Sequence, residues 1–197
     1  MEKALKKTKN IPKEWYEKYR WFYTSNKHLI IGGKNAEQNE ELVKKFLKTN
    51  PKYVVMHTKD PGSPFSIIVA DNPTEKDLEE TAIFTGSFSR AWRDGKKKAS
   101  VDVFLMEQIV KMKNMKSGTF GVIEKVDRKS LELKLYLTIQ KERARFVPQK
   151  PLKEQTICIV PGKMPKDQIA EELAVKLEIT KEEILNALPT GGSKICK

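Results

Sequence analysis

The strictest pattern in the sequence is an alternation of apolar and polar residues between residues 131 and 139. The apolar positions share a period of two and are Leu131, Leu133, Leu135, Leu137 and Ile139. Such a period places successive side chains on opposite faces of a strand, so one face is buried and the other is wet. We therefore expect a strand over residues 130–140 that forms a hairpin, through a turn at residues 126–129, with a strand over residues 119–125.

Further strands and helices are mixed along the rest of the chain. Apolar and aromatic runs predict strands over residues 20–24, 29–31, 53–57, 65–70, 101–111 and 156–160. Helical spacing and capping residues predict helices over residues 13–18, 36–48, 74–95, 166–177 and 181–188. Hairpins dominate this order of elements, so we expect an α+β fold with a mixed, mostly antiparallel sheet and two main helices.

The composition along the chain predicts three segments. Residues 1–11 are expected to form a basic, flexible tail, residues 12–147 the main domain, and residues 148–197 a small strand–helix–helix extension. Residues 141–153 are polar and contain two prolines, which is typical of a linker. Residues 189–197 are rich in glycine and are expected to form an irregular tail.

The net charge of +12 is unevenly distributed. Residues 151–197 hold seven lysines and seven acidic residues, so the whole excess lies in residues 1–150. A positive field attracts polyanions, and nucleic acid is the commonest of these because neutralised phosphates release counterions. The alternative is a solvated lysine-rich surface of the kind that thermophilic proteins carry. The segregation of charge favours a polyanion-binding face, from which the neutral residues 151–197 are expected to point away.

Membrane, secreted and metal-binding classes find no support in the sequence. No apolar run approaches the roughly 18 residues that a membrane span needs. The lysine-rich N-terminus is followed by Pro12, Glu14 and Trp15, so no signal peptide is expected. Cys158 and Cys196 have neither metal-ligand nor redox spacing. We therefore expect reduced thiols, a cytoplasmic location, and no metal or other cofactor.

Enzyme chemistry has one candidate position. His28 falls in a predicted hairpin turn and is expected to be exposed, whereas His57 ends a strand before a loop rich in glycine and proline. With Asp60 and Ser63, His57 could form a hydrolytic set. Nothing in the pattern places Ser63 on a nucleophile elbow, so we favour a structural or ligand-contacting role for His57 and expect no catalytic residue.

Basic residues interleaved with aromatic residues are more informative. Five positive charges, on Arg90, Arg93, Lys96, Lys97 and Lys98, surround the end of one predicted helix. The helix dipole explains one or two cations at such an end, but not five. A second basic and aromatic set holds Arg20 with Trp15, Tyr19, Trp21 and Tyr23. Aromatic side chains can stack on unpaired bases, although we expect about half of these four, and also Trp92, to be buried in the core.

Several of these blocks together resemble the NFACT-R domain family. The resembling blocks are Trp15–Phe22, Leu29–Glu40, His57 with Pro61–Ser63, and Ser89–Trp92 with Lys97 and Val101–Val103. In that family an aromatic-rich strand is followed by an Ile-Gly-Gly-basic turn into a Gln-Asn-Glu helix. Lys111 and Gly118 also stand where the family has a Val-Lys and a glycine. The resemblance covers roughly residues 12–125, and its first block is the most specific.

The resemblance implies an RNA-binding module over residues 12–147. Larger family members combine it with an NFACT-N domain, a helix-hairpin-helix region and a coiled coil, and act with the large ribosomal subunit and tRNA in the rescue of stalled nascent chains. This chain looks like a stand-alone form, for which tRNA or rRNA, and the ribosome itself, are the expected partners. The alternatives are an accessory subunit of RNA modification or an enzyme acting on tRNA near His57, and a structural ribosome-associated protein. Nothing in the sequence sets the oligomeric state.

The expected RNA-binding residues share positive charge, amide groups or close backbone approach. They are Arg20, Trp21, Gly32, Gly33, Lys34, Asn35, Gln38, Asn39, His57, Lys59, Gly62, Ser63, Arg90, Arg93, Lys96, Lys97, Lys98 and Lys111. Gly33 would let a ligand approach the backbone, and Lys34 beside a helix N-terminus would attract an anion. We expect Lys34 and Arg93 to face one common surface.

Overall fold

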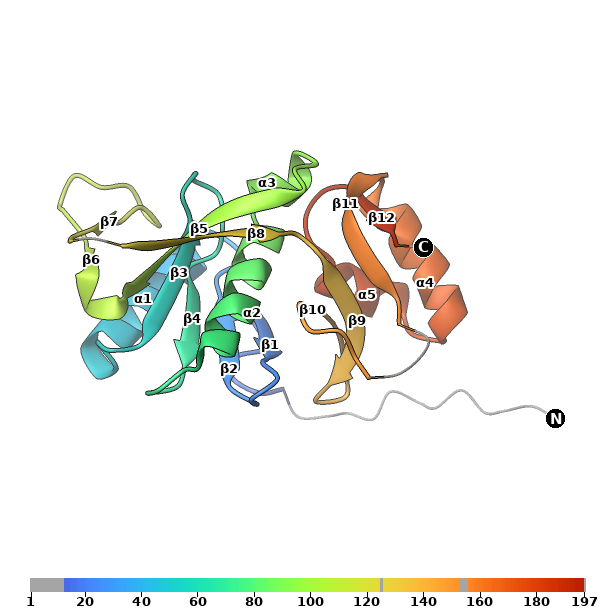
Figure 1. The fold of residues 1–197 in the computed structure, drawn as a ribbon, viewed down its shortest axis with the longest axis horizontal. Coiled ribbons are helices and arrows are strands. Elements are labelled where there is room, and N and C mark those ends of the chain that lie inside the picture. The colour runs from blue at the N-terminus through green and yellow to red at the C-terminus, as the bar shows by residue number, and fades with distance from the viewer. Residues whose placement is uncertain (1–12, 125, 153–155, 197) are drawn as a thin grey trace.

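The computed structural model describes residues 13–124, 126–152 and 156–196 and contains two main antiparallel sheets (Figure 1). The first sheet has the strand order β1-β2-β4-β3-β5-β8. Its strands are β1 (Arg20–Tyr23), β2 (Leu29–Gly32), β3 (Val54–Thr58), β4 (Ser66–Val69), β5 (Lys98–Leu105) and β8 (Asp127–Glu132). β1 and β2 form the hairpin that the sequence predicts, with Trp21 opposite Ile31.

The second sheet has the order β10-β9-β11-β12. Its strands are β9 (Leu135–Gln140), β10 (Arg143–Val147), β11 (Cys158–Met164) and β12 (Ser193–Ile195). A short pair, β6 (Ile109–Val110) and β7 (Gly121–Val122), follows the 3-10 turn η1 (Met106–Gln108). The confirmed fold class is therefore α+β, with sheets that are antiparallel throughout.

Helices cover both faces of the first sheet and one side of the second. They are α1 (Ala36–Thr49), α2 (Glu75–Ser87), α3 (Arg90–Arg93), α4 (Lys166–Leu177) and α5 (Lys181–Ala187). On one face of the first sheet, Leu42 of α1 packs in a core with Ile31. On the opposite face, Phe84 of α2 packs in a core with Ile30. Neighbouring isoleucines are both buried because the sheet has a helix on each side.

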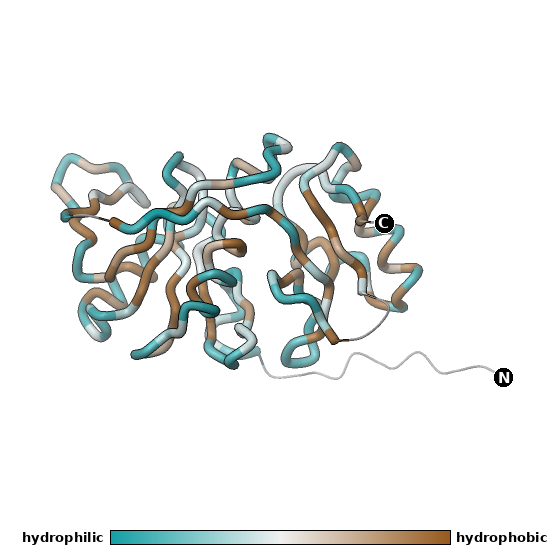
Figure 2. Tube along the Cα trace, viewed as in Figure 1, coloured by the Kyte–Doolittle hydropathy of each residue, from teal (hydrophilic) through white to brown (hydrophobic). Residues whose placement is uncertain are grey.

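A third core joins α3, α4 and α5 to the second sheet. Trp92, Phe146, Ile159 and Leu173 are among its buried side chains. Figure 2 shows that apolar residues follow the strands and the inner sides of the helices, while polar residues dominate the loops. Trp92 belongs to α3, the short helix that follows α2. This core therefore joins α3 to the second sheet.

Residues 131–139, in which apolar and polar side chains alternate, are divided between two strands that belong to different sheets. β8 ends at Glu132 and pairs with β5, whereas β9 begins at Leu135 and pairs with β10 and β11. The predicted hairpin with residues 119–125 is therefore wrong, and Ile139 is 57% exposed. A period of two indicates one buried face, but it does not indicate which strand lies alongside. The chain passes from the first sheet to the second between Glu132 and Leu135. The domain boundary expected at residue 147 stays a prediction.

Other boundaries also differ from the sequence-based expectation. The predicted linker contains β10, and the predicted glycine-rich tail contains β12. The helix predicted over residues 13–18 is absent, and residues 15–18 form a turn instead. The long helix expected from residue 74 is interrupted after α2, because the Ser89 side chain accepts a hydrogen bond from Ala91 N and caps α3. The predicted caps Asn35, Thr74 and Thr180 are confirmed.

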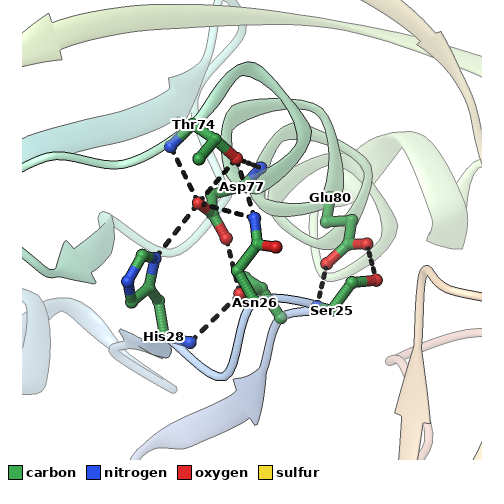
Figure 3. Close-up of polar contacts among 7 residues, drawn as sticks. Ser25, Asn26, His28, Thr74, Asp77 and Glu80 are labelled. Atoms are coloured by element: carbon green, nitrogen blue, oxygen red, sulfur yellow. Dashed lines mark hydrogen bonds and ion pairs between the residues drawn. The ribbon is translucent and has the colours of Figure 1, made fainter.

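A buried carboxylate ties the β1–β2 turn to the start of α2 (Figure 3). Asp77 is fully buried and accepts hydrogen bonds from Thr24 Oγ1 at 2.6 Å, Thr74 N at 2.8 Å and Asn26 Nδ2 at 3.2 Å. The ring of His28 donates to it through Nδ1 at 3.1 Å. His28 is therefore half-buried and engaged in the fold, whereas the sequence suggested simple exposure.

The two cysteines are joined by a disulfide between β11 and the residue after β12, which corrects the expectation of reduced thiols. Cys196 N also donates to the Cys158 carbonyl at 2.8 Å. The sequence separation of 38 residues gave no signal, because the pairing of β11 with β12 brings the cysteines together. Within the described residues, no helix is long and apolar enough to cross a membrane.

Candidate nucleic-acid interface

One cleft of about 760 Å³ collects most of the predicted site residues. The predicted residues that line it are Arg20, Gly33, Lys34, Asn35, Asn39, His57, Lys59, Gly62, Ser63, Arg90 and Arg93. They come from β1, the β2–α1 loop, α1, β3, the β3–β4 loop and α3. Lys34 and Arg93 therefore share one cleft, as the sequence predicts, although 59 positions separate them in the chain.

The β2–α1 loop forms one wall and is fixed by hydrogen bonds around the start of α1. Asn35 Oδ1 accepts from Gln38 N at 2.8 Å, and Gln38 Oε1 accepts from Lys34 N at 3.0 Å. These bonds hold the Lys34 backbone against the first turn of α1. The positive end of the helix dipole lies at the cleft, because Asn35 and Ala36 both line it.

Asn39 connects this wall to the β3–β4 loop. Its Oδ1 accepts from Phe65 N at 3.1 Å and its Nδ2 donates to Ser63 O at 3.5 Å. The side chain is buried, and the room for it exists because position 33 is glycine: a Cβ there would lie 2.2 Å from Asn39 Oδ1. Asn39 and Gly33 therefore position the loop, and the close backbone approach predicted for a ligand is made by Asn39 itself.

The β3–β4 loop forms the second wall. Ser63 Oγ accepts from Thr58 N at 2.9 Å and donates to Pro64 O at 3.1 Å. Gly62 adopts a φ of +104°, and a Cβ there would lie 2.7 Å from the Arg90 side chain. The carbonyl of Gly62 accepts from Arg90 N at 3.0 Å, so this loop places the start of α3 and its arginine at the rim.

His57 lies in the cleft with its ring stacked against Phe65, at a centroid distance of 4.5 Å. Its Nδ1 donates to the carbonyl of Thr58 at 2.7 Å, which leaves Nε2 as the free ring nitrogen. Burial lowers the pKa of His57, so the ring is neutral at pH 7 and Nε2 is a hydrogen-bond acceptor. The hydrolytic set considered for His57 and Ser63 is not assembled, because each side chain bonds to backbone groups instead.

The cleft is strongly positive. Its cations are Arg20, Lys34, Lys59, Arg90 and Arg93, and Asp102 is the carboxylate among its lining residues. That carboxylate is already held by Arg128, through Nε to Oδ1 at 2.6 Å and Nη2 to Oδ2 at 3.1 Å. Burial lowers the pKa of Arg20 to about 10, so its guanidinium is still charged at neutral pH. The field inside the cleft therefore favours an anion.

Some predicted residues lie outside the cleft. Trp21 is buried in the core, and Gly32 packs against Pro64. Lys111 Nζ is bound to Glu40 at 3.1 Å and to two loop carbonyls, so it holds the chain segment around Gly118 in place. The remaining predicted residues that do not line the cleft are Gln38, Lys96, Lys97 and Lys98.

Sequence reasoning did not single out the aromatic residues of the cleft or its C-terminal lining residue. Phe65, Phe88, Phe104 and Phe120 give the cleft an aromatic lining, and Thr190 enters it from the C-terminal part of the chain. Phe65 and Phe104 are buried, whereas Phe88 and Phe120 are partly exposed, and nothing local in the sequence distinguishes the two kinds. Within the described residues, no cluster of His, Cys, Asp or Glu could hold a metal ion.

Comparison with known proteins settles the family. The family described as the NFACT protein RNA binding domain matches residues 18–124. The chain belongs to the NFACT-R family. This match confirms the resemblance carried by the aromatic strand, the Gly-Gly turn and the Gln-Asn-Glu helix, and the matched range contains every cleft wall described above.

Individual relatives extend the similarity of this NFACT-R chain. The archaeal Rqc2 homolog aRqcH of Methanocaldococcus jannaschii is 32% identical over 222 residues, which cover 98% of this chain and 31% of the relative. The ribosome quality control complex subunit NEMF of Homo sapiens is 34% identical over 108 residues, covering 45% of this chain and 10% of the relative. The NFACT-R chain thus spans less than a third of the length of these curated relatives.

A solved structure shares part of the fold. The C-terminal part of the fibronectin/fibrinogen-binding protein from Streptococcus suis aligns with a TM-score of 0.50 and 24% identity. The alignment covers 64% of this chain and 48% of the other.

Proposed function

We propose that this NFACT-R chain is a non-catalytic module that binds RNA in the cleft and acts in ribosome-associated quality control. The observation that supports it is a cleft lined by five cations whose one lining carboxylate is neutralised by Arg128. The family is described as RNA-binding, and its relatives are named as ribosome quality control subunits. We propose rRNA or tRNA as the ligand, and the ribosome in the cytoplasm as the place of action.

The chemistry of the cleft fits a nucleic-acid strand. Arg90 and Arg93 at the rim can pair with phosphate oxygens, which position RNA without reading its sequence. The half-buried ring of His57 rests on the buried Phe65, and its free Nε2 can accept a hydrogen bond from a ribose 2′-hydroxyl or a base amino group. A 2′-hydroxyl contact there would favour RNA over DNA.

The test is equilibrium binding of labelled unfractionated tRNA, and of a large-subunit rRNA fragment, to the wild type and to an Arg90→Ala/Arg93→Ala double variant. We expect the double variant to bind about tenfold or more weakly, which corresponds to roughly 1.4 kcal/mol. A Lys181→Ala variant, which removes one exposed lysine on α5, serves as the control and should lose less than about twofold.

Salt dependence gives a second measurement. Each phosphate contact contributes about 0.7–0.9 to the slope of log affinity against log salt, so the five cleft cations should give a slope near −4. A flat salt profile, or equal affinities of the wild type and the double variant, would contradict RNA binding in this cleft.

A further inference from the structure

Residues 189–196 connect α5 to the disulfide, and we call them the strap. The strap follows Leu188, which is buried in the core that α3, α4 and α5 share with the second sheet. It contains β12 and ends at Cys196. One end of the strap is thus fixed by apolar packing and the other by a covalent bond.

The strap contacts the rim of the cleft that α3 forms. Thr190 lines the cleft itself, although the neutral charge of residues 151–197 predicted that this part points away. Gly191 packs on the backbone of α3, where an added Cβ would lie 2.6 Å from Arg93 Cα. Ser193 Oγ accepts a hydrogen bond from Trp92 Nε1 at 3.1 Å, and both side chains are buried. The position of α3 therefore depends on the strap.

Backbone pairing holds the strap only weakly. β12 is an edge strand, because the order β10-β9-β11-β12 gives it one neighbour among the described strands. Its register with β11 shifts between Pro161 and Met164, which both lie opposite Ser193. Pro161 has no N–H to donate to this ladder. A short and irregular edge strand opens locally at a low free-energy cost, so a covalent clamp has a large effect on it.

The disulfide is the covalent clamp on the strap. It joins Cys196 to Cys158 of β11, and Cys196 N donates to the Cys158 carbonyl at 2.8 Å. A longer backbone bond joins Gly162 N to Gly192 O at 3.2 Å. Cys158 is buried, whereas Cys196 is partly exposed. A small thiol can therefore approach the disulfide from the side of Cys196.

Reduction of this disulfide takes two electrons and two protons, which two molecules of a small thiol supply. The first thiolate forms a mixed disulfide with one cysteine and releases the other, and the second thiolate then releases the first cysteine and leaves as the thiol's own disulfide. In cytoplasmic proteins a disulfide is typical of redox sensing or of hyperthermophile proteins that it stabilises. The contacts between the strap and α3 favour redox sensing, because they connect the disulfide to the RNA-binding cleft.

We propose, resting on the RNA-binding function above, that the disulfide regulates the cleft: the oxidised chain holds α3 in its RNA-binding position, and the reduced chain releases the strap. The coupling runs through Ser193 and Gly191, which contact Trp92 and Arg93. When the strap opens, the Trp92 indole loses its acceptor and Arg93 loses the backbone packed against it. The reduced cleft therefore binds RNA more weakly than the oxidised cleft.

The test measures the binding of labelled unfractionated tRNA to the full chain with the disulfide closed and open. Oxidised glutathione closes it and excess dithiothreitol opens it, and thiol titration should find two more thiols per chain in the second sample. The reduced chain should bind about fivefold or more weakly. A Cys158→Ser/Cys196→Ser variant should bind like the reduced wild type, and dithiothreitol should not change its affinity.

Asp77→Asn separates regulation from a general loss of stability. Asp77 is buried and lies outside the cleft lining and the strap. Well below its thermal midpoint, this variant should bind tRNA within about twofold of the wild type and respond to dithiothreitol in the same way. If Asp77→Asn binds as weakly as the reduced wild type, lost stability explains the effect and the proposal is wrong.

Linkage gives a second measurement that needs no variant. If the oxidised chain binds tRNA more tightly by a given factor, tRNA must favour the oxidised over the reduced chain by the same factor. In a fixed mixture of reduced and oxidised glutathione, saturating tRNA should therefore lower the fraction of reduced chain. An unchanged fraction, or equal tRNA affinities of the oxidised and reduced chains, would overturn the proposal.

The outcome also separates this inference from the proposed function. If Arg90→Ala/Arg93→Ala weakens tRNA binding while the oxidised and reduced chains bind equally, the cleft binds RNA and the disulfide is only structural. If the arginine double variant has no effect, the proposed function itself fails.

Discussion

The indole Nε1 of Trp92 donates a hydrogen bond to Oγ of Ser193, a residue 101 positions later in the chain. Both side chains are buried, so no water replaces either partner. The bond joins the short helix that bears Arg90 and Arg93 to the last strand of the second sheet. The arginine rim of the cleft therefore depends on the far end of the chain.

Removing this bond should destabilise the protein measurably. Ser193→Ala leaves the indole N–H buried without an acceptor, which costs about 1–3 kcal/mol. Chemical denaturation should show this loss of unfolding free energy, with Ser130→Ala, a substitution at an exposed position of β8, as a comparison site. An unchanged denaturation midpoint for Ser193→Ala would show that another group satisfies the indole.

Gly33→Ala should act mainly on folding rather than on RNA contact. The added Cβ would lie 2.2 Å from Asn39 Oδ1 and 2.6 Å from the Asn39 backbone N, and the backbone atom has no free space to move. Overpacking of this kind costs about 1–3 kcal/mol. In the absence of RNA, the thermal midpoint of Gly33→Ala should therefore be lower than that of the wild type.

Gly95→Ala provides the comparison. Gly95 has a φ of +73°, but no atom lies within 4 Å of its added Cβ, so only backbone strain of about 1–2 kcal/mol is expected. If Gly33→Ala retains the thermal midpoint of the wild type yet loses tRNA affinity, position 33 is a glycine because a ligand approaches the backbone closely. The packing of Asn39 is then not the reason.

The buried carboxylate of Asp77 should make stability depend on acid pH. Burial alone would raise its pKa, but hydrogen bonds from Thr24, Thr74 and Asn26 outweigh burial and hold the pKa well below its ordinary value. The folded state thus binds the proton less readily than the unfolded state, whose Asp pKa is about 3.9. The stabilisation is complete above that value and is lost as the pH falls through the folded pKa.

Unfolding free energies measured between about pH 5 and pH 2 should therefore decrease, and the decrease should be shallower in Asp77→Asn. At neutral pH this variant should lose about 1–3 kcal/mol, because an amide cannot accept every bond that the carboxylate accepts. Parallel pH profiles for Asp77→Asn and the wild type would show that other acids govern the acid transition.

Local signals in the sequence predicted much of the fold. Asn35 and Thr74 mark helix starts through their own side-chain bonds, and the β1–β2 hairpin follows from two apolar runs around a turn. Lys34 and Arg93 could be placed in one cleft because their motifs flank strands of a single sheet. Such features depend on neighbouring residues or on a known motif.

The rest depends on contacts between distant segments. Arg145 falls in a stretch that looks like a linker, and its stacking on Trp21 exists only after the two sheets pack. The disulfide likewise follows from the pairing of β11 with β12. Charge summed over residues 151–197 is zero, so it could not reveal that Thr190 lines the same cleft as Arg90 and Arg93.

Reduction of the disulfide should lower stability without removing the fold. Cys158 and Cys196 close a loop of 38 residues, for which the loss of chain entropy in the unfolded state stabilises by about 2–4 kcal/mol. The thermal midpoint should fall in the presence of a thiol reductant, and a Cys158→Ser/Cys196→Ser variant should match the reduced wild type. An identical midpoint with and without reductant would contradict a stabilising disulfide.

Truncation after Val147 should disrupt more than the removed segment. Ile159, Ile169, Leu173 and Ile184 are all fully or almost fully buried in the core that also covers Trp92. Without them, the β9–β10 hairpin and Trp92 lose their apolar cover, so the fluorescence of Trp92 should shift to longer wavelength. Trp21 lies in the separate core under α1, and Trp92→Phe in the truncated chain isolates the signal. If the truncated chain keeps the emission and cooperative unfolding of the intact protein, residues 148–197 are not needed to bury Trp92. They then cannot hold the arginine rim in place.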